Sequence, residues 1–324
     1  MAHSDPLCLA LREAGQASPR YFTAAEKGLL TFSFVDFKRE KPFQVPLCEV
    51  ENCPPAPHSY PRSDYQPPAY SAAQYQSLVR EALEQIHQKQ LDKIVLSRPH
   101  RVATEADPLQ LFHRLRAAYP QATVYLFTHP EIGTWLGATP ETLLRYRRPQ
   151  VQTVSLAGTR RADSEKPFTA KEEAEQQWVT DFIYEELDAH TGVSDIRIGN
   201  RQIWPAGPLE HLRTEISAVL AADKPLDQLV ARLHPTPAVA GAPREAALAL
   251  IAALEKHPRR YYSGYLGLQK KGAAHYYVNL RCGEFVKGGF VAYAGGGITA
   301  QSDPAAEWEE TENKLQTILS HFPA

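Results

Sequence analysis

The chain has 324 residues, of which 43% are hydrophobic and 22% are charged, a composition within the range of ordinary soluble globular proteins. Its formal net charge of −2 provides no global attraction to nucleic acid or to an anionic membrane, which argues against a polyanion-binding function. The sequence contains no run of about eighteen apolar residues and no secretory signal at its start, and its four cysteines lack C-x-x-C spacing. We therefore expect a cytoplasmic protein with reduced thiols and without membrane contact, zinc or disulfides.

The first 70 residues are expected to form a short strand region followed by an irregular connection. Apolar runs between residues 20 and 47 predict one or two strands. The segment from Cys53 to Tyr70 contains six prolines, each of which removes a backbone donor and restricts the residue before it. Residues 71–324 are then expected to form the domain that carries the functional site.

The next part of the chain predicts helices and strands in alternation. Ser71 can cap a helix whose apolar positions recur at helical spacing. Residues 93–97 predict a buried strand, and Asp107 followed by Pro108 is typical of a helix start. Residues 123–155 predict successive antiparallel strands.

The C-terminal half predicts three helices and a group of strands. Two long helices are expected at residues 167–189 and 243–257. Strand candidates follow at 260–269, 273–281 and 290–297, and a closing helix is expected at 304–320. Strands in hairpin-like groups between long helices indicate an α+β fold, with a large, mainly antiparallel β-sheet sandwich as its core and helices packed outside.

Acidic side chains recur at helical spacing on two of the expected helices. Glu307, Glu310 and Lys314 share one face of the closing helix, and the earlier long helix carries Glu172 and Glu175. Four carboxylates that face one another would repel unless a hard divalent cation lay between them, and oxygen ligands favour Mg²⁺ or Mn²⁺. On spacing alone, solvated acidic helix faces are the favoured interpretation and a metal site is the alternative.

Four further positions have the residue types of a substrate site. Arg281 at the end of one strand and Gly295 at the end of the next can hold a carboxylate through a guanidinium fork and a backbone N–H. Lys93 lies inside an apolar strand, which is costly for an ammonium unless it is paired or neutral, so it is a candidate general base. Glu141 follows a turn between two strands. The alternatives are a structural salt bridge, a turn glycine, a lysine that reaches solvent and a solvated carboxylate.

Eight segments of the chain match motifs of one known family, in the family's order: residues 93–98, 137–141, 156–160, 233–241, 262–264, 280–282, 294–298 and 307–311. The chain therefore resembles the chorismate-utilising enzymes, which include isochorismate, salicylate, anthranilate and aminodeoxychorismate synthases. The resemblance covers about residues 75–320 and leaves residues 1–70 poorly covered. It is closest to isochorismate synthases.

The resemblance implies a Mg²⁺ site and a site for chorismate. Glu175 and Glu310 would bind the ion directly, Glu172 and Glu307 would complete the acidic ring partly through water, and the ion would anchor the ring carboxylate of chorismate. The other substrate contacts would come from Arg281, the Gly295 backbone, Tyr262 and Lys314 at the enolpyruvyl carboxylate, and from His211, Gly158 and Thr159 along the pocket wall.

The resemblance also implies the reaction. Lys93 matches the lysine that deprotonates water in isochorismate and salicylate synthases, where anthranilate synthases typically have glutamine, and Ala157 replaces the nucleophilic lysine of aminodeoxychorismate synthases. Lys93 would act as general base and Glu141 as general acid in an isochorismate synthase, a monomer without a glutaminase subunit. A salicylate synthase and an inactive protein that binds a chorismate-like ligand are the alternatives. The chain departs from the family where Gln176 follows Glu175 in place of histidine.

Overall fold

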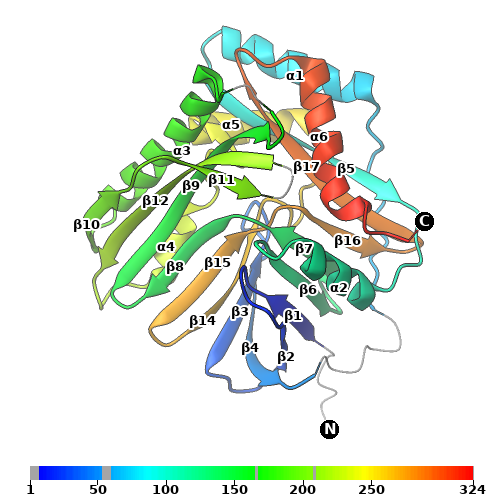
Figure 1. Cartoon of the computed structure of the whole chain (residues 1–324), viewed down its shortest axis with the longest axis vertical. Coiled ribbons are helices and arrows are strands. Elements are labelled where there is room, and N and C mark those ends of the chain that lie inside the picture. Colours follow the sequence, from blue (N-terminus) through cyan, green and yellow to red (C-terminus); the bar gives the residue numbers. More distant parts are fainter. Residues whose placement is uncertain (1–6, 53–59, 165–166, 207–208, 324) are drawn as a thin grey trace.

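The computed structural model describes residues 7–52, 60–164, 167–206 and 209–323. Within these residues, seventeen strands form one hydrogen-bonded network, and every pairing between two named strands is antiparallel. Helices pack on the outside of this network (Figure 1). The α+β fold with a large antiparallel sheet, which the sequence predicted, is confirmed.

Strands and helices alternate in groups along the described chain. The strands are β1 (Cys8–Arg12), β2 (Arg20–Ala24), β3 (Leu30–Val35), β4 (Phe43–Val50), β5 (Lys93–Val102), β6 (Thr123–His129), β7 (Gly133–Thr139), β8 (Thr142–Arg147), β9 (Gln150–Arg161), β10 (Val193–Ile198), β11 (Gln202–Ala206), β12 (Leu209–Leu220), β13 (Gly241–Ala242), β14 (Tyr265–Lys270), β15 (Ala273–Val278), β16 (Cys282–Val286) and β17 (Gly289–Thr299). The helices are α1 (Ala72–His87), α2 (Pro108–Ala118), α3 (Ala170–Asp188), α4 (Leu226–Leu233), α5 (Arg244–Leu254) and α6 (Pro304–Leu319).

The strand pairings follow one continuous path. From the edge formed by β10 and β11, the path runs through β12, β9, β8, β15, β14, β3, β4, β2, β1, β6, β7, β16, β17 and β5 to β13. The sheet folds back on itself, so that β9 and β12, near one end of the path, share the walls of a cavity with β5 and β17, near the other end. This closure positions the candidate site.

Four helices begin at a side chain that satisfies their free backbone donors. Ser71 accepts a hydrogen bond from the backbone N–H of Gln74 at the start of α1, and Asp107 caps α2 in the same way. Thr169 caps α3 and Asp303 caps α6. The caps of α3 and α6 fix where these two helices start, and hence which of their acidic residues lie near the sheet.

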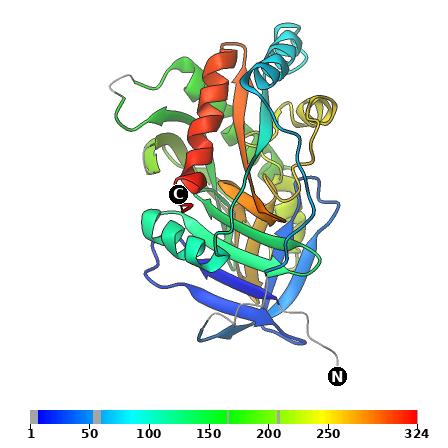
Figure 2. The same ribbon diagram turned by 90° about the vertical axis from the view of Figure 1, so that its right-hand side faces the viewer.

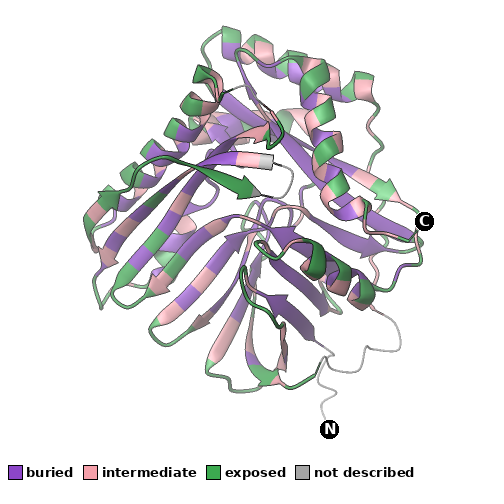
Figure 3. Ribbon diagram, viewed as in Figure 1, coloured by how far each residue is buried: buried purple, intermediate pink, exposed green. Residues whose placement is uncertain are grey.

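The helices cover the outside of the sheet. α3 packs on β9 and β12, α6 packs on β17, and α1 packs against α6 (Figure 2). The strands are largely buried, whereas the outer faces of the helices are exposed (Figure 3). In the parts of the chain that the structure describes, no helix is long and apolar enough to cross a membrane. Cys8, Cys48 and Cys282 form no disulfide with one another, and Cys53 lies outside the described residues.

The N-terminal region contains more strands than the sequence predicted. Residues 20–47 predict one or two strands, whereas the structure has β2, β3 and β4 in this region and β1 before them. β1 pairs with β6 and β3 pairs with β14, so these strands belong to the same sheet as the rest of the chain, and a domain boundary at residue 70 stays a prediction. Within the proline-rich connection, residues 53–59 lie outside the described residues, and residues 60–70 form no helix and no named strand.

Other element boundaries also differ from the expectation. The strand expected at 260–269 begins at Tyr265, because a turn precedes it in which the N–H of Tyr262 donates to the carbonyl of Arg259 at 2.9 Å. The helix expected from residue 167 begins at Ala170, after its cap. The sequence patterns predict no elements where the structure has β10, β11, β12, α4 and β16.

Candidate active site

A cavity of about 100 Å³ lies between the two ends of the sheet path. Its walls come from β5, β9, β12 and β17, from α3 and α6, and from the connections between strands. Glu172 and Glu307 do not line it. The other eleven predicted site residues do: Lys93, Glu141, Gly158, Thr159, Glu175, His211, Tyr262, Arg281, Gly295, Glu310 and Lys314.

Lys93 is the first residue of β5 and is only 2% exposed. Its Nζ lies 3.7 Å from Oε2 of Glu175 on α3, so the ammonium has a carboxylate partner in the cavity. On the neighbouring strand β17, a Cβ at Gly297 would lie 3.0 Å from Cε of Lys93, so glycine leaves room for the lysine. Lys93 therefore points into the cavity and does not reach solvent.

Glu141 lies in the connection between β7 and β8 and is 5% exposed. Its carbonyl accepts a hydrogen bond from the N–H of Val278 at 3.1 Å, which fixes the backbone beside the cavity. Burial raises the pKa of the Glu141 carboxyl to about 8, although the positive charges of Lys93 and Arg281 oppose this shift. The carboxyl is therefore protonated at neutral pH and can donate a proton to a molecule in the cavity.

Two polar side chains, the guanidinium of Arg281 and the imidazole of His211, form part of the cavity wall and differ in charge. Among the described residues, no carboxylate lies within ion-pair distance of the Arg281 guanidinium, and desolvation of this partly buried group lowers its pKa from its ordinary value of 12.5. Burial, with the charges of Arg281 and Lys314, lowers the pKa of His211 to about 4, so its imidazole is neutral at pH 7. Its Nδ1 lies 3.0 Å from Oγ1 of Thr159, and its buried Nε2 has no hydrogen-bond partner within the described chain.

Lys314 connects α6 to β17. Its Nζ lies 2.5 Å from Oε1 of Glu310 and donates a hydrogen bond to the carbonyl of Gly295 at 2.8 Å. Burial acts to raise the pKa of Glu310, but the ion pair with Lys314 outweighs it and the pKa lies below its ordinary value. A Cβ at Gly295 would lie 3.0 Å from the hydroxyl of Tyr262, which packs over this strand.

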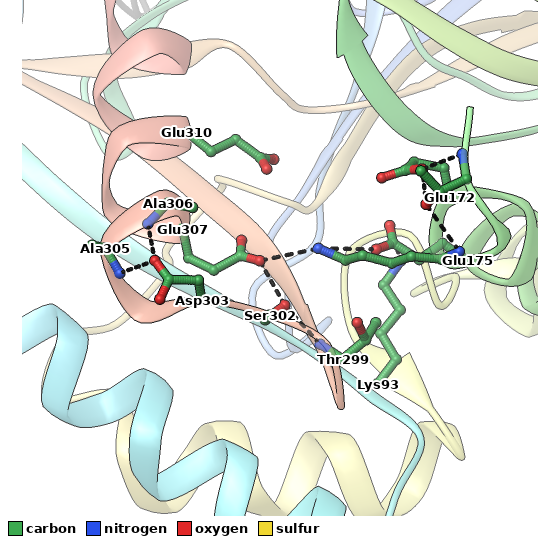
Figure 4. A network of polar contacts seen from close by, with 12 residues as sticks. Lys93, Glu172, Glu175, Thr299, Ser302, Asp303, Ala305, Ala306, Glu307 and Glu310 are labelled. Atoms are coloured by element: carbon green, nitrogen blue, oxygen red, sulfur yellow. Dashed lines mark hydrogen bonds and ion pairs between the residues drawn. The ribbon is translucent and has the colours of Figure 1, made fainter. Parts of the chain in front are cut away.

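The acidic side chains of α3 and α6 face each other (Figure 4). Lys171 on α3 lies between them, with its Nζ 3.3 Å from Oε1 of Glu307 and 4.0 Å from Oε1 of Glu175. Burial, and then the charge of Glu310, raise the pKa of Glu307, and its Oε2 is buried without a hydrogen-bond partner among the described residues. The Lys171 ammonium thus occupies a cation position between two carboxylates.

Glu172 has a structural contact instead. Its Oε2 accepts hydrogen bonds from the N–H and Oγ1 of Thr169 at 2.7 and 2.5 Å, which completes the capping box of α3. Gly158 has a φ of 70°, and a Cβ there would lie 2.9 Å from Cβ of Glu172, so β9 and the first turn of α3 are in close contact. The described residues contain no group of three or more His, Cys, Asp or Glu side chains close enough to hold a metal ion.

Gln176, which stands where the family has histidine, faces the sheet. It is 1% exposed, and its amide nitrogen donates to the hydroxyls of Ser155, Thr180 and Thr214 at 3.0, 3.0 and 2.9 Å. These hydrogen bonds join α3 to β9 and β12. The departure from the family pattern therefore changes the support of the helix that carries Glu175, and not the cavity wall.

A second cavity, of about 510 Å³, adjoins the first and shares Pro140, His211 and Arg281 with it. Its other walls come from the end of α2, from β11 and from the C-terminal half of α6. Trp204 in this wall is 38% exposed. The larger cavity thus provides a route from the surface to the Arg281 guanidinium.

Sequence reasoning missed several residues of the site. Lys171 precedes Glu175 by one helical turn, and this spacing is the signal that would have identified it as a partner of the acidic side chains. Ala238 and Val239 line the cavity. They lie in the matching segment 233–241, but the resemblance assigns no role to either residue. Leu156 and Leu280 form apolar parts of the wall, and nothing in their residue type distinguishes them from core residues.

Replacing Lys171 with Met is expected to destabilise the chain in the absence of divalent cations. The substitution leaves the buried Glu307 and the half-buried Glu175 without this counter-charge, which we expect to lower the free energy of unfolding by about 1–3 kcal/mol. Urea unfolding with EDTA measures the loss, and excess Mg²⁺ should restore part of it, because an ion bound to the folded state stabilises it. The control is Lys287→Met, which removes an exposed pair with Asp64. Equal stability of the two variants in EDTA would contradict the expectation.

Comparison with known proteins agrees with this geometry. The sequence pattern of the family described as "Chorismate binding enzyme" matches residues 47–322. The chain therefore belongs to the chorismate binding enzyme family. The solved structure of MenF, the menaquinone-specific isochorismate synthase from Escherichia coli, superposes with a TM-score of 0.82 over 98% of this chain and 90% of that one, at 20% identity.

The relatives of this chain include enzymes with different reactions. The chain is 30% identical to the isochorismate synthase EntC of Escherichia coli over 76% of its length and 66% of the relative's. It is 32% identical to a salicylate biosynthesis isochorismate synthase of Pseudomonas aeruginosa, over 79% and 56% of the two lengths. It is 29% identical to anthranilate synthase component 1 of Haloferax volcanii, over 82% and 53%. The chain thus spans between about half and two thirds of these relatives.

Proposed function

We propose that the chain is an isochorismate synthase, which converts chorismate to isochorismate. The observation that carries this proposal is that one cavity is lined by a buried amine, Lys93, and by Glu141, a carboxyl that is protonated at neutral pH. These are the general base and the general acid that an exchange of hydroxyl groups through water requires. The relatives that are isochorismate synthases support the same reaction.

The cavity suits a substrate with two carboxylates. Arg281 lines the cavity with a guanidinium that has no carboxylate partner among the described residues, which fits one carboxylate of chorismate. Lys314, Tyr262 and the backbone at Gly295 lie on the same cavity and supply further donors. The neutral His211, with its free Nε2, and the turn at residues 158–159 would contact the ring.

The acidic residues offer the oxygen ligands that a divalent cation at the other carboxylate would need, and the Lys171 ammonium lies between two of them. Glu307 has a buried oxygen without a partner in the described chain, and the carboxylates of Glu307 and Glu175 already hold the cation of Lys171 between them. Glu175 and Glu310 would hold Mg²⁺ directly, with Glu307 and Glu172 completing the site partly through water. When bound, the ion would neutralise and orient the ring carboxylate of the substrate.

The residues of the chain would then move two protons. This step requires Lys93 as the free amine, which takes a proton from a water molecule as the water oxygen bonds to the second ring carbon. Glu141 donates its proton to the hydroxyl at the fourth ring carbon, which leaves as water while the ring double bonds shift. One water is added and one is released, so the substrate and the product are isomers.

The test is the product formed from chorismate by the purified chain. We expect Mg²⁺-dependent formation of isochorismate, identified by chromatography and NMR, and loss of turnover in excess EDTA. Isochorismate does not fluoresce, whereas salicylate does. Turnover that persists in EDTA would remove the metal from the proposal.

Other products would identify the alternatives. Fluorescent salicylate together with pyruvate would identify a salicylate synthase, and a product that contains nitrogen and requires ammonium salts would identify an anthranilate-type reaction. Chorismate binding without any turnover would identify a ligand-binding protein. A cytoplasmic location, a monomeric state and the absence of a glutaminase subunit stay predictions, as does the use of the product in menaquinone or siderophore synthesis.

A further inference from the structure

Strand β5, which carries Lys93, has a neighbour on one edge for only part of its length. β13 is 2 residues long and pairs with β5 at Ile94 and Lys93. One position further, the N–H of Val95 donates to the carbonyl of Ala240 at 2.8 Å. Beyond this bond, no described strand continues along this edge, although β17 pairs with the other edge as far as Val102.

Two buried side chains supply the missing hydrogen bonds. The N–H of Ser97 donates to Oε1 of Glu255 at 2.7 Å, and the carbonyl of Val95 accepts from Nη2 of Arg259 at 2.6 Å. Glu255 and Arg259 thus provide the acceptor and the donor that a further strand would offer to β5. The two side chains also pair with each other at 2.6 and 2.9 Å, and they are 3% and 2% exposed.

Arg259 joins three segments that form cavity walls. Its Nη1 donates to the carbonyl of Val239 at 2.8 Å, and Val239 itself lines the cavity. Its backbone carbonyl accepts from the N–H of Tyr262, another wall residue. With the bond to Val95, two residues from Lys93, the guanidinium connects the strand of the amine to the wall at Val239, and the backbone of the same residue contacts the wall at Tyr262. Arg259 itself lines neither the smaller nor the larger cavity.

The Ser97 hydroxyl contacts Glu255 and His257, as a nucleophile contacts its base, but this arrangement does not serve catalysis. The Ser97 hydroxyl lies 2.9 Å from Oε1 of Glu255 and 3.1 Å from Nε2 of His257. However, Ser97 is 0% exposed and lines neither cavity. Burial lowers the pKa of His257 to about 4, so the imidazole is neutral and takes part in a fixed hydrogen-bond network.

We propose that Arg259, held by Glu255, is a positioning residue for the proposed reaction. It fixes the start of β5, and therefore the Lys93 amine, relative to the walls at Val239 and Tyr262. Proton transfer requires the amine within hydrogen-bond reach of the attacking water, and a displacement of about 1 Å costs on the order of 10²-fold in rate. A buried ion pair often adds little to stability, which is consistent with selection of this one for geometry.

The inference rests on the proposed function, so chorismate turnover of the unaltered chain is measured first. We then expect Arg259→Ala to lower kcat on the order of 10²-fold with a smaller change in KM, because the substrate carboxylates bind elsewhere. Millimolar guanidinium should restore part of kcat, since it can replace the lost group. Arg259→Lys, which keeps the charge but not the fork, should recover less than tenfold.

The neighbouring residue provides a matched control. Arg260 pairs with Glu284, which is buried away from both cavities, with Nε 2.8 Å from Oε2. Arg260→Ala should keep kcat near the unaltered value and should not respond to guanidinium. The inference would be overturned if Arg259→Ala kept the kcat of the unaltered chain, or if both variants lost kcat equally. It would also be overturned if Arg259→Ala raised KM and left kcat unchanged.

Two further measurements keep the inference testable. If Arg259→Ala does not fold, Glu255→Gln is the second variant, because it removes the charge that holds the guanidinium and keeps the shape of the Glu255 side chain. Glu255→Gln should also lower kcat by a larger factor than it raises KM. Amide hydrogen exchange at residues 93–97 does not depend on the reaction. Faster exchange there in Arg259→Ala than in Arg260→Ala is expected, and equal exchange would overturn the positioning role even if the chain does not convert chorismate.

Discussion

Replacing Glu141 with Gln is expected to lower the turnover of chorismate on the order of 10²–10⁴-fold, the usual contribution of a general acid. Glutamine has nearly the same shape and can still donate a hydrogen bond, but it cannot transfer a proton to the leaving hydroxyl. The fold should persist, because the Glu141 backbone makes the hydrogen bond to Val278 and the side chain makes no ion pair with a described residue. Turnover by the purified variant, with circular dichroism to verify folding, measures the effect.

The pH dependence gives a second readout of the same group. Since the pKa of Glu141 is raised to about 8, the carboxyl is protonated below this pH and loses its proton as the pH rises through it. The kcat/KM of the unaltered chain should therefore fall by about tenfold per pH unit above about pH 8, and Glu141→Gln should lack this decrease. Glu284→Gln, which alters another buried carboxyl, is the control and should keep both turnover and the decrease. A Glu141→Gln variant with near-normal turnover would refute the acid role.

Replacing Lys93 with Ala is expected to have an effect of the same size, on the order of 10²–10⁴-fold, because no other amine that lines the cavity takes its place. The other lysine in the wall, Lys314, is occupied by Glu310 and the carbonyl of Gly295. KM should change less than kcat, since the proposed base contacts the attacking water and not the substrate carboxylates.

The control for this substitution is a lysine outside the site. Lys287→Ala removes an exposed ammonium and should leave turnover unchanged. Thermal unfolding of both variants separates loss of catalysis from loss of folding. If Lys93→Ala turned over chorismate at a rate close to that of Lys287→Ala, the general base would have to be another group, and the preference for water as nucleophile would lose its main support.

Part of the candidate site could be predicted from the sequence because several of its side chains lie in a local pattern. Helical spacing identified the face of Glu310 and Lys314, and the apolar run around Lys93 identified a buried strand. These features depend only on neighbours within a few residues. The family resemblance then supplied the relation between distant segments, which the periodicities could not.

What the sequence did not predict depends on contacts between distant residues. β10 and β11 are largely exposed strands that pair with β12, and only β12 pairs with β9, so the apolar pattern of these two strands is too weak to identify them. The capping contact of Glu172 with Thr169 depends on the helix starting at Ala170, which helical spacing does not specify, and the role of Glu172 near an ion stays a prediction. Arg259 and Glu255 become partners of β5 only after the sheet has closed.

The order of the strand pairings has a consequence for the N-terminal strands, which contribute no residue to the cavity. Among the described strands, strand pairing joins the half of the sheet that contains β9 and β12 to the half that contains β5 and β17 only through β3, β4, β2 and β1. These four strands therefore link the two halves of the sheet. A change in their register would shift the wall that carries Lys93 against the wall that carries Gly158 and His211, without altering any residue that touches the substrate.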